Sequence, residues 1–200
     1  MNKQDLLNDP NVIKFIEFFS EKWDSGLEFK VGVKHRGRNA EYNNTTNLKE
    51  ILDIYSWQYS INTNLEFPEE LKRGSQLHES EKVFDFCKKR LLVNGNINAN
   101  PAELRAATEI ILKWGGVFTK GNKNKATNIS YDLHKDYQEV VKKWNDINLN
   151  NAEFSPIEKL NFTSNAGFTK VYSLLLNDFI IYDSRVSVAL AYLIEMCFEK

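Results

Sequence analysis

The chain has 200 residues, 42% of them hydrophobic and 12% aromatic, which is enough for one folded domain with a sizeable core. It carries 26 Lys and Arg residues against 27 Asp and Glu residues, and this balance excludes a protein that binds nucleic acid through an overall positive charge. Cys87 and Cys197 are too few and too far apart for a four-cysteine zinc or iron–sulfur site, and no run approaches the roughly 20 apolar residues of a membrane span.

Hydrophobic residues recur at helical spacing along most of the chain. The clearest boundary is at Asn100 and Pro101, because an asparagine cap and a first-turn proline are typical of a helix start. The expected helices span residues 11–23, 47–59, 75–92, 100–114, 131–144, 155–162, 169–177 and 184–198. The sequence thus predicts an all-α fold in a single domain, residues 1–200, with a division into sub-layers 1–95 and 96–200 left open. We expect a cytoplasmic protein with no metal or other cofactor and no membrane partner.

Two segments are basic and contain no acidic residue. The first follows residues 27–33, whose weak polar and apolar alternation is typical of an extended segment, and the second is a loop expected over residues 117–130. Each is either a local patch that contacts nucleic-acid phosphates or an ordinary solvated loop. The candidate phosphate-binding residues are Lys34, Arg36 and Arg38 in the first segment and Lys120 and Lys123 in the second.

Aromatic residues at the expected helix ends are candidates for stacking on a nucleotide base. Trp57 and Tyr59 end the helix expected at 47–59, and Trp114 and Phe118 lie around the glycines that follow the helix expected at 100–114. An aromatic stripe at this spacing more often packs in a core, so both interpretations stay open.

The stretch from residue 165 to 190 carries two opposite charges in the most apolar part of the chain. Lys170 falls in the first turn of one expected helix, and Asp183 stands at the N-cap position of the last one. The reversal between the two helices can return both side chains to one cleft. Because a buried charge is costly unless it is paired or has a chemical role, Lys170 and Asp183 are the candidate catalytic residues. The alternative is a helix cap with a structural salt bridge.

The order of these features resembles the helix-hairpin-helix DNA glycosylase superfamily. The resemblance lies in a turn followed by Thr169-Lys170-Val171, an apolar helix, and a hydrophobic run that ends in Asp183 with a valine after it. It is closest to the 8-oxoguanine DNA glycosylase branch, including small bacterial proteins with that fold, and it covers about the last 45 residues. In that branch the lysine after the hairpin attacks the sugar and an aspartate at the next helix start assists.

The resemblance implies a monomeric enzyme that flips a nucleotide out of double-stranded DNA and excises a damaged or modified base, in repair or in defence against phage. Asp183 would stabilise the positive charge on the deoxyribose. An unprotonated Lys170 would attack the sugar and add lyase activity through a Schiff base, whereas with a protonated Lys170 water would be the nucleophile. The implied DNA-binding residues near this pair are Asn165, Gly167, Thr169 and Arg185.

A second hypothesis is a non-catalytic DNA-binding or interaction protein that retains the glycosylase fold. An enzyme needs Lys170 and Asp183 to face one open, base-sized pocket, whereas a binding protein needs only the basic rim. These two expectations separate the hypotheses.

Overall fold

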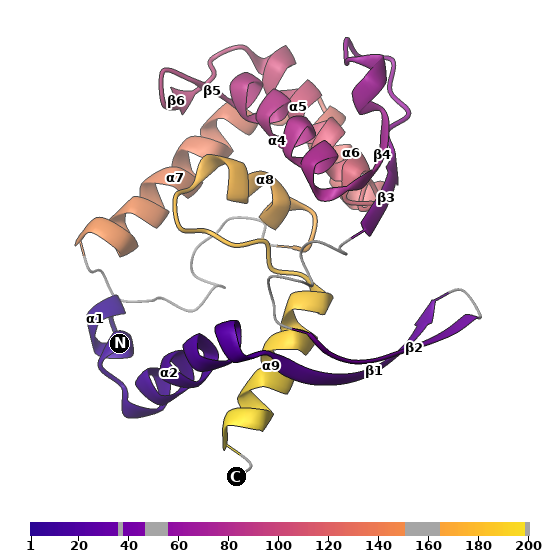
Figure 1. Cartoon of the computed structure of the whole chain (residues 1–200). Helices are drawn as coiled ribbons and strands as arrows, with labels where there is room; N and C mark the ends of the chain where they lie inside the picture. The colour runs from indigo at the N-terminus through magenta and orange to yellow at the C-terminus, as the bar shows by residue number, and fades with distance from the viewer. Residues whose placement is uncertain (36–37, 47–55, 151–164, 199–200) are drawn as a thin grey trace.

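The computed structural model describes residues 1–35, 38–46, 56–150 and 165–198, and within these ranges the fold is mostly helical (Figure 1). The helices are α1 (Lys3–Leu7), α2 (Pro10–Ser25), the short 3-10 helix η1 (Glu69–Leu71), α4 (Leu77–Leu91), α5 (Pro101–Trp114), α6 (Lys120–Thr127), α7 (Leu133–Asn150), α8 (Phe168–Leu175) and α9 (Ser184–Phe198). The strands are β1 (Leu27–His35), β2 (Arg38–Thr46), β3 (Ser56–Ser60), β4 (Arg73–Gln76), β5 (Leu92–Val93) and β6 (Asn96–Ile97). In these ranges, no helix combines the length and the apolar character that crossing a membrane requires.

Most of the predicted helices are present. The helices expected at 11–23, 75–92, 100–114, 131–144, 169–177 and 184–198 correspond to α2, α4, α5, α7, α8 and α9. The start of α5 shows why local signals suffice, because Asn100 Oδ1 accepts a hydrogen bond from the Ala102 N–H at 3.0 Å and Pro101 occupies the first turn. The helix expected at 155–162 lies outside the described residues.

Antiparallel hairpins add strands to this helical fold, so the all-α prediction holds only as a mostly helical one. Within the described residues, the strands form two-stranded sheets that pair β1 with β2, β3 with β4, and β5 with β6. The hairpin of β1 and β2 is the longest, with a register that runs from Leu27 opposite Thr46 to His35 opposite Arg38. Strand β1 contains the extended segment expected at 27–33 and continues to His35.

The helix expected at 47–59 is wrong at its end, because residues 56–60 form strand β3; residues 47–55 lie outside the described part. The sequence Ser-Trp-Gln-Tyr-Ser alternates polar and aromatic side chains with the two-residue period of a strand. Trp57 and Tyr59 accordingly point inward, whereas Gln58 is exposed. Gly74 of β4 leaves room for the Tyr59 side chain, because a β-carbon on Gly74 would lie 2.6 Å from the Tyr59 hydroxyl.

The hydrophobic core lies between α4, α5, α7 and α8 (Figure 1). Its fully buried side chains include Val83 and Leu91 of α4, Ile110 of α5, Tyr137 of α7 and Tyr172 of α8. Helix α4 thus shares one core with three helices that follow residue 95.

Residues 120–127 form helix α6, although the sequence predicts a loop there. Its composition gives little helix propensity, and contacts from α5 hold its end in place. The Arg105 guanidinium donates hydrogen bonds to the carbonyl oxygens of Ala126 and Ile129 at 3.2 and 3.3 Å. The contact with Arg105 thus stabilises α6 where the local sequence does not favour a helix.

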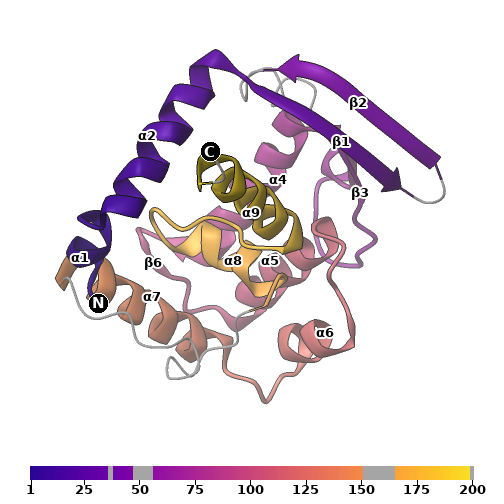
Figure 2. The same ribbon diagram turned by 90° about the horizontal axis from the view of Figure 1, so that it is seen from below.

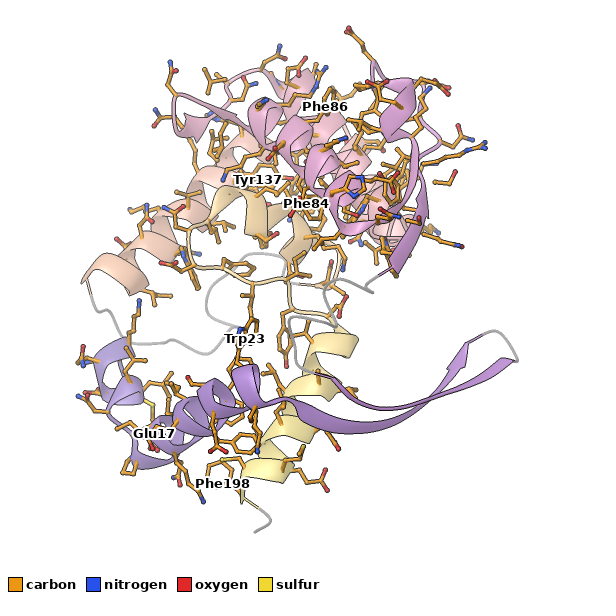
Figure 3. The ribbon with its side chains drawn as sticks, in the orientation of Figure 1. Glu17, Trp23, Phe84, Phe86, Tyr137 and Phe198 are labelled. Carbon is orange, nitrogen blue, oxygen red and sulfur yellow. The ribbon has the colours of Figure 1, made fainter. Side chains whose placement is uncertain are left out.

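Helices α2 and α9 pack against each other on one side of the core, next to the hairpin of β1 and β2 (Figures 1 and 2). Figure 3 shows Trp23 and Phe198 on these elements, whereas Phe84 and Tyr137 lie among the core helices. Helix α9 begins next to α8, which brings the last two helix starts together.

Candidate active site at the helix starts of α8 and α9

The turn before α8 is held by the side chain of Asn165. Its Oδ1 accepts hydrogen bonds from the N–H groups of Gly167 and Phe168 at 2.8 and 3.0 Å. These hydrogen bonds order the turn just before Gly167, which is the N-cap residue of α8. Helix α8 therefore has a defined start, and Lys170 lies in its first turn.

Lys170 is a buried cation, with 6% of its side chain exposed. Its Nζ donates to the Ala166 carbonyl oxygen at 2.7 Å and lies 3.4 Å from Asp183 Oδ2. The structure thus brings together the two charges that the sequence selects as candidate catalytic residues.

Asp183 is the N-cap of α9, as predicted. Its Oδ1 accepts a hydrogen bond from the Val186 N–H at 3.3 Å, and its carbonyl oxygen accepts one from the Ser187 N–H at 2.9 Å. The carboxylate therefore interacts with the helix start through one oxygen and with Lys170 through the other. Its side chain is 17% exposed, so it lies nearer to the surface than the lysine amine does.

A hydrogen bond accompanies the ion pair and joins the residues that precede Lys170 and Asp183. The Thr169 hydroxyl donates to the Tyr182 carbonyl oxygen at 3.1 Å. Thr169 is only 4% exposed, so the structure does not offer this residue to DNA as the sequence predicts. Its hydroxyl is engaged inside the protein instead.

Gly115, at the end of α5, packs directly against the aliphatic part of Lys170. A β-carbon on Gly115 would lie 2.6 Å from Lys170 Cδ and 2.8 Å from Cε, which is closer than carbon atoms approach without contact strain. Gly115 therefore ends the helix, as predicted, and also leaves room for Lys170. The sequence does not reveal this second role.

Gly167 is buried and serves close packing. A β-carbon there would overlap with the amide nitrogen of Asn122, which itself donates to the Val117 carbonyl oxygen at 2.8 Å. The Asn165 amide completes this link by donating to Asn122 Oδ1 at 3.0 Å. The Gly167 N–H donates to Asn165 Oδ1 within this turn, and a contact of Gly167 with DNA stays a prediction.

The predicted basic residues lie on two separate elements. Lys120 and Lys123 are exposed on α6, the helix that Asn122 joins to the turn before α8. Lys34 and Arg38 belong to β1 and β2, in the hairpin that extends away from the core helices in Figure 1. Arg36 lies outside the described residues. Arg185 is in the first turn of α9, and its side chain is outside the described part.

Three of the aromatic residues predicted to line a base pocket, Trp57, Tyr59 and Trp114, pack in or against the core. The Trp57 indole N–H donates to the Trp114 carbonyl oxygen at 3.0 Å, and the Trp114 indole N–H donates to Ser80 Oγ at 3.1 Å. Tyr59 is buried, and burial raises the pKa of its phenol. Phe118 is half-buried, with the Lys113 ammonium 5.0 Å above its ring. The core interpretation therefore describes Trp57, Tyr59 and Trp114, while a base-stacking role of Phe118 stays a prediction.

A further buried ion pair joins α6 to α7, and the sequence gives no sign of it. Lys125 Nζ lies 2.9 Å from Asp136 Oδ2, with both side chains nearly buried. The ammonium also lies over the rings of Tyr131 and Phe168, at 4.9 and 4.6 Å from their centroids. This pair is enclosed by aromatic rings, unlike the Lys170–Asp183 pair at the two helix starts.

Metal-ligating side chains do not gather in the described ranges, since no three His, Cys, Asp or Glu residues there are placed to hold an ion. A scan against models of protein families finds no match, and searches of curated proteins and of solved structures find none either.

Proposed function

We propose that this protein is a DNA glycosylase that excises a damaged or modified base and leaves an abasic site. The observation that carries the proposal is the contact between Lys170 Nζ and Asp183 Oδ2 at 3.4 Å, where two helices begin side by side. A buried ion pair adds little net stability, because each charge loses its hydration. A chemical role explains better than stability why the two charges are held there.

Asp183 is proposed to assist departure of the base. When the N-glycosidic bond breaks, the base leaves with the bonding electron pair and the deoxyribose becomes positively charged. A carboxylate held by the Val186 N–H and by Lys170 is already oriented when this charge develops. Water then adds to the sugar carbon C1′, and its proton passes to the departing base, so the products are a free base and an abasic site.

Lys170 has two proposed roles that depend on its protonation. As an ammonium ion, with the Ala166 carbonyl and Asp183 as acceptors, it orients the carboxylate and leaves water as the nucleophile. As a free amine it would attack C1′ itself and displace the base, which takes up the proton that the amine releases; the C1′–O4′ bond of the sugar then opens to give a Schiff base. The second role requires that the amine leaves Ala166, whereas the first uses the contacts of this structure.

Helix α6 is the proposed contact for the DNA backbone. Lys120 and Lys123 are exposed on it, and residues 117–130 contain no acidic side chain that would repel phosphates. The link from Asn122 to Asn165 joins this helix to the turn that precedes Lys170. Phosphates bound at α6 would therefore lie next to the helix start that carries the lysine.

The experiment is incubation of the protein with a panel of duplexes that each carry one damaged or modified base, with abasic sites as the readout. Release of a base from at least one duplex is expected. If the protein binds the duplexes and releases no base from any of them, the alternative of a non-catalytic DNA-binding protein replaces the proposal.

A second measurement decides the role of Lys170. Borohydride reduces a Schiff base to a stable amine, so an adduct that maps to Lys170 by mass spectrometry would identify the lysine as nucleophile. Base release without such an adduct would identify water as the nucleophile. Lys123→Gln is the control for trapping by a surface lysine.

A further inference from the structure

We propose that Thr169 is a positioning residue that brings Asp183 to Lys170. The inference rests on the proposed glycosylase function of that pair, and it explains how a connector of a few residues returns the carboxylate to the lysine. Thr169 precedes Lys170, and Tyr182 precedes Asp183. The hydrogen bond from Thr169 to Tyr182 and the ion pair from Lys170 to Asp183 therefore join the two helix starts at consecutive residues.

The Thr169 hydroxyl has one hydrogen and two acceptors within reach. Tyr182 O is 3.1 Å away, whereas Ala166 O is 3.4 Å away. The Ala166 carbonyl also accepts the Lys170 ammonium at 2.7 Å. The shorter and less crowded contact is the one to Tyr182, so the hydroxyl bridges the two helix starts instead of bonding back within its own turn.

Among the described residues, the connector between α8 and α9 is also attached to α7. At its beginning, the Trp144 indole N–H donates to the Asn177 carbonyl oxygen at 2.8 Å, and the Trp144 and Phe179 rings pack edge to face. Toward its end, the side chains of Ile180 and Tyr182 are 66% and 54% exposed, so their burial does not hold it. The Thr169 hydroxyl thus holds the end of the connector that carries the carboxylate.

The test compares Thr169→Val, which keeps the shape of the side chain and removes the donor, with Thr169→Ser, which keeps the donor. Thr108→Val is the matched control, because it removes a buried threonine hydroxyl that bonds Leu104 and Tyr137 within the core. Base release is measured on whichever duplex of the panel the wild-type protein processes. Hydrogen exchange of the Val186 and Ser187 amides is measured in parallel, since both donate to Asp183.

We expect Thr169→Val to lower kcat by about 10- to 100-fold with little change in KM, because a displaced catalytic group costs rate and not binding. Protection of the two amides should fall by about 5-fold, which is the usual effect of losing one hydrogen bond. Thr169→Ser should restore both quantities, and Thr108→Val should change neither.

Unchanged amide protection in Thr169→Val would overturn the proposal, and so would equal losses in Thr169→Val and Thr169→Ser, since the loss would then not follow the hydroxyl. The exchange measurement does not depend on enzymatic activity. If the wild-type protein releases no base, the glycosylase function fails while amide exchange still decides whether Thr169 positions Asp183.

Discussion

Gly115→Ala should displace the candidate catalytic lysine without straining the backbone. Gly115 has φ −74° and ψ −3°, which an alanine adopts freely. The new β-carbon would lie 2.6 Å from Lys170 Cδ and 2.8 Å from Cε. Since carbon atoms rest at about 3.5–4.0 Å, the lysine chain must retreat by roughly 1 Å.

A shift of this size is large compared with the tolerance of an active site. The amine lies 3.4 Å from Asp183 Oδ2, and a misplacement of about 1 Å can cost about 100-fold in rate. We expect the rate of base release by Gly115→Ala to fall by about 10- to 100-fold. Stability should fall by only about 1 kcal/mol, because the long lysine side chain can move.

The assay measures single-turnover base release together with thermal unfolding. Gly121→Ala in α6 is the control, because its β-carbon would meet nothing within 4 Å and alanine favours a helix. The control should keep wild-type activity and gain up to about 1 kcal/mol. If Gly115→Ala processes the same duplex at the wild-type rate, the position of Lys170 does not matter for the chemistry and the reasoning is refuted.

Three further predictions concern stability and DNA binding. Asp136→Asn should lower the free energy of unfolding by about 3 kcal/mol, because it leaves Lys125 buried without its partner. The control is Glu139→Gln, which removes an exposed ion pair and should change this free energy by less than about 0.5 kcal/mol. Chemical denaturation of both variants measures this difference. Replacing Lys120 and Lys123 by glutamine should lower the slope of log affinity against log salt concentration by about 2 in DNA-binding titrations; an unchanged slope would remove α6 from the interface. The free energy of unfolding should keep its full value up to about pH 10, the pKa of an unfolded tyrosine, and should fall at higher pH. Burial raises the pKa of several phenols in the folded protein, so above pH 10 the unfolded chain loses these protons first. Unfolding measured from pH 8 to 12 checks this, and equal stability across that range would contradict it. The phenols are those of Tyr59, Tyr131, Tyr137 and Tyr172.

Local signals carry much of the fold. The asparagine and proline at the start of α5 predict that helix because a cap and a preset φ act within one turn. The meeting of Lys170 and Asp183 is also predictable, since two helix starts separated by one short helix and a reversal lie at the same end. Each of these signals involves only a few neighbouring residues.

The errors arise where a distant segment decides the structure. Trp57 and Tyr59 alternate over too few residues to separate a strand from a helix end, and pairing with β4 settles the choice. Helix α6 is held by the Arg105 guanidinium of α5, which lies 21 residues before Ala126 in sequence. Thr169 looks like a polar residue at a helix start, and its role appears only once the connector returns to it.

The most direct test of the central claim is base release by Asp183→Asn. The change keeps the size of the side chain and an oxygen that can accept the Val186 N–H, so α9 should keep its cap. The buried Lys170 loses its anionic partner, so the unfolding temperature should fall while the protein still folds. Because the amide carries no negative charge to stabilise the deoxyribose cation, base release should disappear. Wild-type base release by a folded Asp183→Asn protein would contradict the account.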